Sequence, residues 1–312
     1  MVGNSRARFW LLLTGALVYA NSFRGAFIFD DVSSIIRNPA VQQGWPWRAV
    51  WAVSSRPLTE WTFALNFTLG GLSPLGYHVV NLAIHLAAGV LLMDLVRRTL
   101  QTPRVTSRDR EAASSLSFVI ALVWLVHPIA THSVTYVSQR AESLMGLCAL
   151  LTLWCAAAEP ASCGTSSPAR ISRLGRSATS APSARAAAAP TSVLAPQPTA
   201  RRLRPDVWSL AATLACLCGM LSKPVMAPVL VWLYDGVFLF ESFGAAWRSR
   251  WRFYAGLALT WLVLAFVLST SRDYAASAGW ALIEPTPLQY LRSQPGVLLE
   301  YFHRAWWPSV FS

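Results

Sequence analysis

The sequence contains few charged residues. Asp, Glu, Lys and Arg make up 13% of its 312 residues, whereas 54% are hydrophobic. Soluble domains carry roughly 25% charged residues, so this composition excludes a soluble enzyme of the ordinary kind. The hydrophobic residues gather in long runs and the mean hydropathy is +0.41, which excludes a protein that is disordered throughout. The sequence therefore predicts a membrane protein with several spans.

Acidic residues and lysine are also scarce. The chain has 14 Asp and Glu against 26 Lys and Arg, a formal net charge of +12, and Lys223 is its only lysine. The arginines interrupt apolar segments and form no basic stripe, so we expect no nucleic-acid partner. The five cysteines show neither a disulfide framework nor zinc-site spacing, and the histidines show no metal-ligand spacing. We predict no metal site built from protein ligands alone, and the sequence identifies no cofactor with certainty.

Seven apolar segments predict membrane-spanning helices, since a span needs about 20 residues. They cover residues 9–29, 77–95, 116–128, 144–158, 207–221, 225–240 and 254–269. Asn21, Ser22 and Arg24 interrupt the first segment, so a signal peptide cleaved near Ala20 is an alternative. We favour a retained helix because the apolar run resumes at Ala26.

Basic residues predict the orientation, because cytoplasmic loops carry an excess of Lys and Arg. If the N-terminus is cytoplasmic, the inner segments hold 17 of the 26 basic residues. We thus divide the chain into a first membrane half, a linker and a second membrane half. They cover 1–158 (with a catalytic first outer loop, 30–76), 159–206, and 207–312 (with an outer C-terminal segment, 270–312). The linker is rich in Ala, Ser, Pro and Arg and predicts a disordered basic cytoplasmic segment.

This topology brings polar clusters from distant segments to the outer face. Asp30 and Asp31 follow the first span, and a carboxylate pair at a span exit is costly to place there. One of them could act as a general base on a hydroxyl, or hold a divalent cation. The alternative is a solvated helix end.

The same face receives three candidate phosphate ligands, Arg56, Arg140 and Lys223. Such cations would stabilise a lipid-phosphate leaving group, although Lys223 could also be an anchor that reaches the membrane interface. His78 and Asn81 share one helix face and could bind substrate or merely join helices. Glu142 is a further substrate-binding candidate.

Tryptophans crowd the first and last outer loops, at Trp45, Trp47, Trp51, Trp61, Trp280, Trp306 and Trp307. Aromatic rings collect at headgroup depth. We therefore expect amphipathic helices in both loops to lie flat on the bilayer.

Four ordered blocks resemble the transmembrane-and-tetratricopeptide-repeat protein O-mannosyltransferases and their bacterial relatives. The first contains Phe-Ile-Phe-Asp-Asp (27–31), Arg-Pro-Leu-Thr-Glu-Trp (56–61) and Gly-Tyr-His-Val-Val-Asn (76–81). The second is His-Pro-Ile-Ala-Thr-His (127–132) with Gln-Arg-Ala-Glu-Ser (139–143); the third is Leu-Ser-Lys-Pro (221–224) with Tyr-Asp (234–235); the fourth lies at 294–308. The blocks extend over nearly the whole chain outside the linker.

The resemblance implies an all-α membrane protein with a GT-C-like bundle. It also implies transfer of a mannose-like sugar from a polyprenyl-phosphate carrier to a protein hydroxyl on the non-cytoplasmic face, with an acidic pair in the first outer loop that matches Asp30 and Asp31. The expected partners are the lipid-linked sugar, a protein acceptor and the bilayer. We expect a multi-pass protein of the bacterial inner membrane, or of the endoplasmic reticulum membrane if it is eukaryotic.

Two departures from the family keep a second hypothesis open. The family usually has Thr-Glu where this chain has Thr131-His132, and Ser-Lys-Glu where it has Ser222-Lys223-Pro224. We also expect a truncated chain without the tetratricopeptide repeats that follow the fourth block in the family. The alternative is a non-catalytic or truncated membrane module that binds lipid-linked sugar or scaffolds an envelope assembly. A transporter is less favoured, because the charged candidates gather at one surface.

Overall fold

The computed structural model describes residues 2–43, 54–162, 207–223, 227–270 and 286–306, and these form an all-α bundle. Most of the predicted linker and the tryptophans at 45, 47, 51, 280 and 307 lie outside the described residues. The elements in chain order are α1 (Val2–Val18), η1 (Ala20–Arg24), η2 (Val32–Ile36), α2 (Pro39–Gln42), α4 (Pro57–Gly70), α5 (Pro74–Leu100), α6 (Ser107–Glu111), α7 (Ala113–Val126), η3 (Pro128–Ala130), α8 (His132–Thr135), η4 (Val137–Gln139), α9 (Arg140–Ser162), α10 (Val207–Ser222), α11 (Ala227–Tyr234), η6 (Asp235–Leu239), α12 (Phe243–Thr270) and α14 (Pro287–Trp306). No strand occurs among the described residues, which confirms the predicted fold class.

A helix covers the core of each predicted span, but the structure does not confirm seven spans. Among the residues that the structure describes, three helices are long and apolar enough to cross a membrane: Pro74–Leu100, Val137–Ala158 and Phe243–Thr270. A fourth arises if Ala113–Val126 and Pro128–Thr135, bent by 55°, form one span. The segments Val207–Ser222 and Ala227–Leu239 are shorter apolar helices.

Helix ends follow local sequence signals. The first helix, α1, ends at Val18, earlier than the predicted Phe29, and the polar residues Asn21 and Ser22 fall in the short 3-10 turn η1. Pro128 ends α7 at Val126, because proline disfavours a helical residue before it. Proline also starts α4 and α5, where its missing N–H costs nothing.

Four apolar clusters form the core of the described bundle, and two of them join the membrane helices. Cys155 of α9 packs with Cys216 of α10 and Leu257 of α12, so residues on both sides of the linker share one core. Leu125 of α7 packs between α1 and α5. An added Cβ at Gly15 or Gly89 would lie 2.8 or 2.9 Å from the Leu125 side chain, so the missing side chains allow these helices to approach closely.

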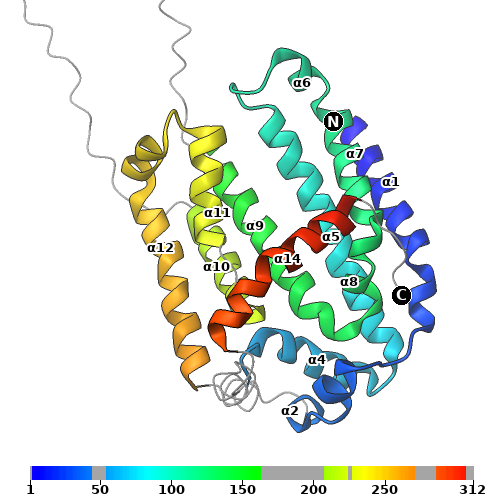
Figure 1. The fold of residues 1–312 in the computed structure, drawn as a ribbon. Helices are drawn as coiled ribbons and strands as arrows, with labels where there is room; N and C mark the ends of the chain where they lie inside the picture. The colour runs from blue at the N-terminus through cyan, green and yellow to red at the C-terminus, as the bar shows by residue number, and fades with distance from the viewer. Residues whose placement is uncertain (1, 44–53, 163–206, 224–226, 271–285, 307–312) are drawn as a thin grey trace, which may run out of the picture.

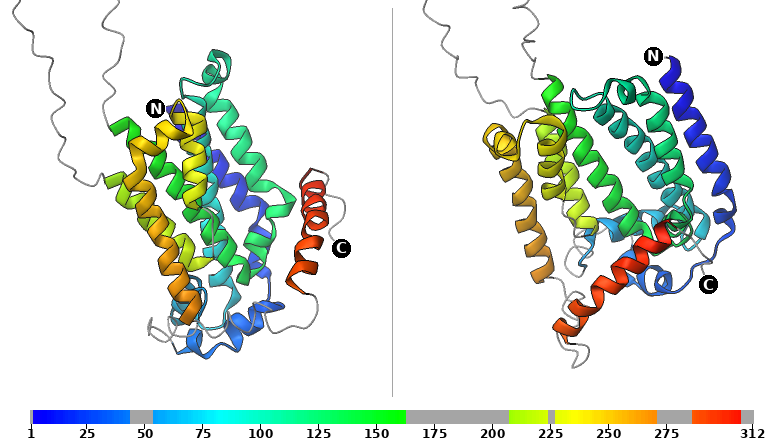
Figure 2. Two further views of the ribbon diagram at one scale, coloured as in Figure 1. Left: turned by 60° about the vertical axis from the view of Figure 1, so that its left-hand side comes forward. Right: turned by 45° about the horizontal axis from the view of Figure 1, so that its top comes forward.

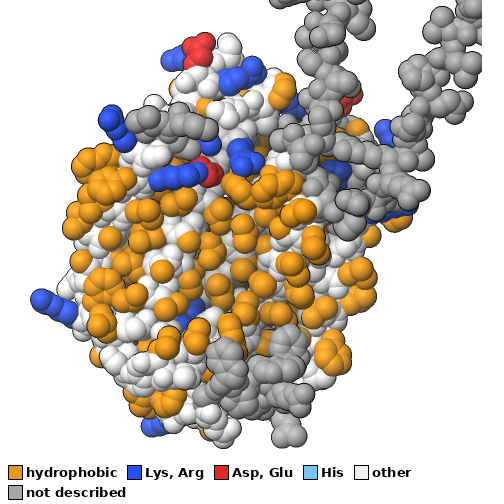
Figure 3. All heavy atoms as spheres, turned by 180° about the vertical axis from the view of Figure 1, so that it is seen from behind, with side chains coloured by type: hydrophobic (Ala, Val, Ile, Leu, Met, Phe, Trp, Pro, Cys, Tyr) orange, Lys and Arg blue, Asp and Glu red, His pale blue; other side chains and the backbone are white. Residues whose placement is uncertain are grey.

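The two ends of the bundle differ. The N-terminus and α6 lie at one end, and α2 and α4 lie across the other (Figure 1). A wide apolar band separates the ends on the face shown in Figure 3, and basic and acidic side chains, the basic ones there being arginines, gather mainly at the α6 end. There Arg8 pairs with Asp94 at 2.5 Å and buried Asp235 pairs with Arg250 at 2.6 Å. The band has the composition of a lipid-facing surface, which agrees with a membrane protein.

The last helix, α14, crosses the outside of the bundle (Figures 1 and 2). Leu291, Leu298 and Phe302 fall on one side of it and Arg292 and Glu300 on the other. The apolar side is exposed, with Phe302 66% accessible. An amphipathic helix thus forms in the last predicted outer loop, and its place on the bilayer stays a prediction.

Candidate functional site

The end of the bundle at α2 and α4 carries the predicted site segments. Residues 28–31 contact residues 136–138 through hydrogen bonds, and the start of α9 contacts the end of α10 through an ion pair. Thr59 of α4 donates to the Ser222 carbonyl at 3.3 Å. Four segments that are distant in the sequence therefore meet at one end, as the sequence predicts.

Asp31 is fully buried and is held by backbone donors. Its carboxylate accepts from the Ser138 N–H at 2.7 Å and from the Ile28 N–H at 3.1 Å. These bonds satisfy two buried backbone groups, which would otherwise be costly. In this structure Asp31 thus fixes the first loop to the turn before α9 and shows no opening toward a substrate.

Asp30 is exposed and has a different environment. Its backbone N–H donates to the Tyr136 hydroxyl at 3.0 Å, and within the part of the chain that the structure describes no hydrogen bond or ion pair reaches its carboxylate. The preceding residue, Phe29, has a φ of +44°, a strained value for a residue with a bulky side chain. Such strain persists where the surroundings enforce it and is often found at functional sites. Asp30 is therefore the member of the pair that is available for chemistry.

Lys223 and Arg56 form the positive part of the site. Lys223 pairs with Glu142 at the start of α9, and its side chain is about one-third exposed (34%). Partial burial, together with the nearby positive charge of Arg56, lowers the pKa of Lys223 despite the Glu142 carboxylate. Arg56 itself is exposed at the start of α4. Lys223 and Arg56 thus supply two cationic donors beside the Glu142 carboxylate, and such donors suit a phosphate.

Arg140 has a structural position that the sequence did not predict. It is fully buried and each of its three guanidinium nitrogens donates to a neutral acceptor. Its bonds include Asn66 Oδ1 at 2.6 Å, Asn81 Oδ1 at 2.7 Å and the Tyr77 carbonyl at 3.0 Å, and it lies 4.6 Å from the centre of the Phe63 ring. Because Arg140 joins α4, α5 and α9 with no exposed surface, a direct contact with a lipid phosphate does not fit this structure.

His78 and Asn81 also act between helices. His78 Nδ1 lies 3.3 Å from the Val134 carbonyl oxygen, and the Asn81 amide donates to the Val137 carbonyl at 3.3 Å. Both side chains are buried. A role of these two buried side chains in substrate binding would have to be indirect. Their contacts fit the alternative, in which they join helices.

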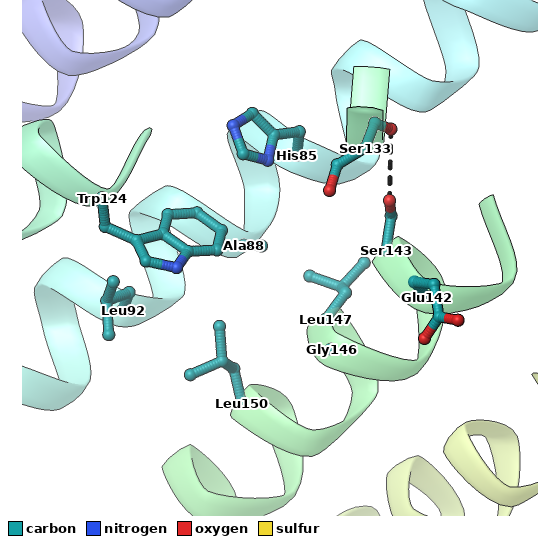
Figure 4. Close-up of a pocket in the computed structure, with 10 residues that line it drawn as sticks. All are labelled: His85, Ala88, Leu92, Trp124, Ser133, Glu142, Ser143, Gly146, Leu147 and Leu150. Atoms are coloured by element: carbon teal, nitrogen blue, oxygen red, sulfur yellow. Dashed lines mark hydrogen bonds between the residues drawn. The ribbon is translucent and has the colours of Figure 1, made fainter. Parts of the chain in front are cut away.

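A largely apolar cavity of about 310 Å³ lies beside Glu142. Leu92, Trp124 and Leu150 line its apolar part, whereas Ser133 and Ser143 lie near Glu142 (Figure 4). The Ser143 hydroxyl donates to the Ser133 carbonyl at 3.2 Å. Sequence reasoning missed these lining residues, since apolar residues of α5, α7 and α9 give no signal of a cavity until the helices are packed.

The structure gives no protein-built metal site among its described residues: no three His, Cys, Asp or Glu side chains come together there. That Asp30 or Asp31 holds a divalent cation stays a prediction.

Comparison with known proteins supports the resemblance. The chain is 34% identical to the protein O-mannosyl-transferase TMTC4 of Homo sapiens over 165 residues, which cover 46% of this chain and 22% of that protein. It is 35% identical to TMTC1 of Mus musculus over 159 residues (45% and 16%) and 34% identical to Tmtc3 of Drosophila melanogaster over 155 residues (42% and 17%). The predicted resemblance is confirmed. No family model and no solved structure matches the chain.

The length of the matched regions limits what the relatives show about this chain. They cover about a fifth of the length of these O-mannosyl-transferases and less than half of this chain, which is less than the nearly full-length resemblance expected from the four blocks. The relatives are named as glycosyltransferases, and activity, substrates and partners of this chain are therefore argued separately below.

Proposed function

We propose that this chain is the membrane part of a glycosyltransferase, which moves a mannose-like sugar from a polyprenyl-phosphate carrier to a protein hydroxyl on the non-cytoplasmic face. One observation carries the proposal: a single short segment contacts both halves of the site. Tyr136 contacts the Asp30 backbone, and Glu142 contacts Lys223. The path from Tyr136 to Glu142 along this mostly helical segment is about 10 Å, a length comparable with that of a sugar and a phosphate together. The names of the matched relatives support this reaction class.

The proposed reaction is a direct displacement. The Asp30 carboxylate accepts the proton of the acceptor hydroxyl while its oxygen forms a bond to the anomeric carbon. The bond from that carbon to the phosphate oxygen breaks, and the lipid phosphate leaves with the electron pair. Lys223 and Arg56 stabilise the developing negative charge. One base and a phosphate leaving group suit inversion at the anomeric carbon.

The apolar cavity supports a lipid-linked donor. Its lining by Leu92, Trp124 and Leu150 suits an isoprenoid chain, and Glu142 at its edge contacts Lys223. A lipid chain in this cavity would place its phosphate beside the cations. From the resemblance and from the arginine excess of the loops at the opposite end, we place the protein in a bacterial inner membrane, or in the endoplasmic reticulum membrane if it is eukaryotic, with the site facing away from the cytoplasm.

The test is Asp30→Asn in the intact protein, with membrane insertion followed in parallel. We expect transfer from polyprenyl-phosphate mannose to a peptide to fall by roughly 10²- to 10⁴-fold while insertion and unfolding temperature stay unchanged. Asp31→Asn should lower both transfer and unfolding temperature, because an amide cannot accept both backbone donors. Glu111→Gln changes an exposed carboxylate at the α6 end and is the matched control. Full activity in the Asp30→Asn/Asp31→Asn double variant would refute the proposal.

A second candidate function is favoured by one observation, the replacement of the two family acids at His132 and Pro224. This candidate is a non-catalytic module that binds lipid-linked sugar or scaffolds an assembly. Binding and turnover measured on the same preparation separate the two candidate functions. A non-catalytic module would bind polyprenyl-phosphate mannose and transfer no sugar, whether residue 30 is Asp or Asn.

A further inference from the structure

A second cavity, of about 380 Å³, lies at the same end of the bundle. It is an open cavity bounded by the end of α1, the turn η1, the end of α7 and the segment from Thr131 to Thr135. It shares no lining residue with the apolar cavity of Figure 4. Sequence reasoning gave no signal of it, because its walls come from segments more than 100 residues apart.

Hydroxyl and amide side chains share the lining of this cavity with Val18 and Val126, and no charged side chain is among its lining residues. Five of its side chains carry a hydroxyl or an amide: Tyr19, Asn21, Ser22, Thr131 and Thr135. Tyr19 donates to the Leu125 carbonyl at 3.0 Å and Thr135 to the Thr131 carbonyl at 3.0 Å, so each hydroxyl oxygen keeps lone pairs that can accept. The Asn21 amide is exposed and has no hydrogen bond among the described residues, and its groups can both donate and accept.

The wall also contains a buried polar atom without a partner. His78 is fully buried, and its Nε2 has no hydrogen-bond partner among the described residues. This atom lies against Gly25 of the cavity wall, where an added Cβ would come within 2.8 Å of it. Because Gly25 has no side chain, only its backbone separates the His78 imidazole from the cavity.

This lining selects the chemistry of a ligand. A charged group would find no counter-charge among the lining side chains. An apolar group would make no use of the Asn21 amide, which has no hydrogen bond among the described residues, or of the lone pairs on Tyr19 and Thr135. A neutral ring that bears several hydroxyls satisfies both conditions, and the volume suits a small molecule of that size.

Both walls of the cavity continue directly to Asp30. On one side Gly25 is followed by the short segment that ends at Asp30. On the other side Thr135 precedes Tyr136, whose hydroxyl accepts from the Asp30 N–H at 3.0 Å. From this placement and this lining we infer that the cavity holds the neutral sugar ring of the lipid-linked donor, with Asn21 and Thr135 binding its hydroxyls. The inference rests on the proposed function and assigns the sugar a subsite separate from the phosphate and the lipid chain.

The experiment measures binding of two probes, polyprenyl-phosphate mannose and sugar-free polyprenyl phosphate, to the full chain in detergent. The test variant is Asn21→Ala/Thr135→Val, which removes two polar groups with little change in volume at Thr135. The matched control is Gln101→Ala/Thr213→Val, at the other end and in α10, where Thr213 makes the same local bond to the Ser209 carbonyl at 2.9 Å. Lys223→Gln reports the phosphate contact.

We expect the test variant to bind the mannose-bearing probe about tenfold more weakly, from two lost hydrogen bonds, and to bind the sugar-free probe as the wild type does. Lys223→Gln should weaken both probes, and the control should weaken neither. The inference is overturned if the test variant keeps the wild-type preference for the mannose-bearing probe, or if it loses both probes equally. If the wild type binds neither probe, the proposed function fails as well, so the two failures are distinguishable.

Discussion

Asp30 and Asp31 are neighbours in the chain, yet their carboxylates have different surroundings. Asp31 accepts two backbone hydrogen bonds in a buried position, whereas Asp30 faces outward after a residue with strained backbone. The buried Asp31 supports the exposed Asp30, because the hydrogen bonds of Asp31 hold the loop in which Phe29 keeps its strained backbone. A positioning residue and a candidate base thus lie side by side.

The lowered pKa of Lys223 predicts an alkaline limit for donor binding. Burial and Arg56 bring this pKa below its ordinary value of 10.5, so the ammonium loses its proton, and its attraction for phosphate, at a lower pH than a free lysine. Its effect on folding has the opposite trend: the cost of the charged form is present below the lowered pKa and is relieved as pH rises toward 10.5. We expect the KM for the lipid-linked donor to rise as the pH increases from the lowered pKa of Lys223 toward 10.5.

The Lys223→Arg variant is the control for that pH profile, because arginine stays charged throughout the range. The rise in donor KM should be absent or greatly reduced in it. A profile that is identical in the wild type and in Lys223→Arg would show that another group titrates, and would remove Lys223 from phosphate binding.

At the scale of elements, the sequence predicted where apolar helices lie and missed what joins them. Runs of apolar residues predicted the cores of α5, α9, α10 and α12, because their length is a local property. The end of α1 was predicted too late, since Ala26 and the apolar residues after it prolong the run although Asn21 and Ser22 already favour a turn. The burial of Arg140 could not be predicted, because its acceptors Asn66 and Asn81 come from two other helices.

Arg140 should therefore matter for stability more than for substrate binding. Arg140→Lys keeps the charge, but a lysine ammonium cannot reach acceptors on both α4 and α5 in the geometry of a guanidinium. We expect the free energy of unfolding to fall by roughly 2–4 kcal/mol, measured as a lower unfolding temperature in detergent. Arg56→Lys, at an exposed site of the same end, should change stability by less than about 0.5 kcal/mol. A normal unfolding temperature together with lost donor binding in Arg140→Lys would contradict this assignment.

At the scale of the whole molecule, an apolar band lies between two unlike ends. The α6 end carries Arg8, Arg97 and their partner Asp94, and the other end carries Asp30, Arg56 and Lys223. The sequence predicted this separation correctly for the site, because alternating apolar segments and loops return every second loop to the same end. Which end faces the cytoplasm depends on the excess of arginine in the loops, a property of the whole chain that no single contact decides.

Cysteine labelling tests this orientation. In a variant without native cysteines, Asp30→Cys, Arg56→Cys and Arg108→Cys would each be exposed in sealed cells or vesicles to a maleimide that cannot cross membranes. We expect Asp30→Cys and Arg56→Cys to react from the non-cytoplasmic side, and Arg108→Cys, on α6, to react only after permeabilisation. Reaction of Asp30→Cys and Arg56→Cys from opposite sides would contradict the site itself. Reaction of both from the cytoplasmic side would leave the site intact and reverse its orientation, so the donor and the acceptor would then have to be cytoplasmic.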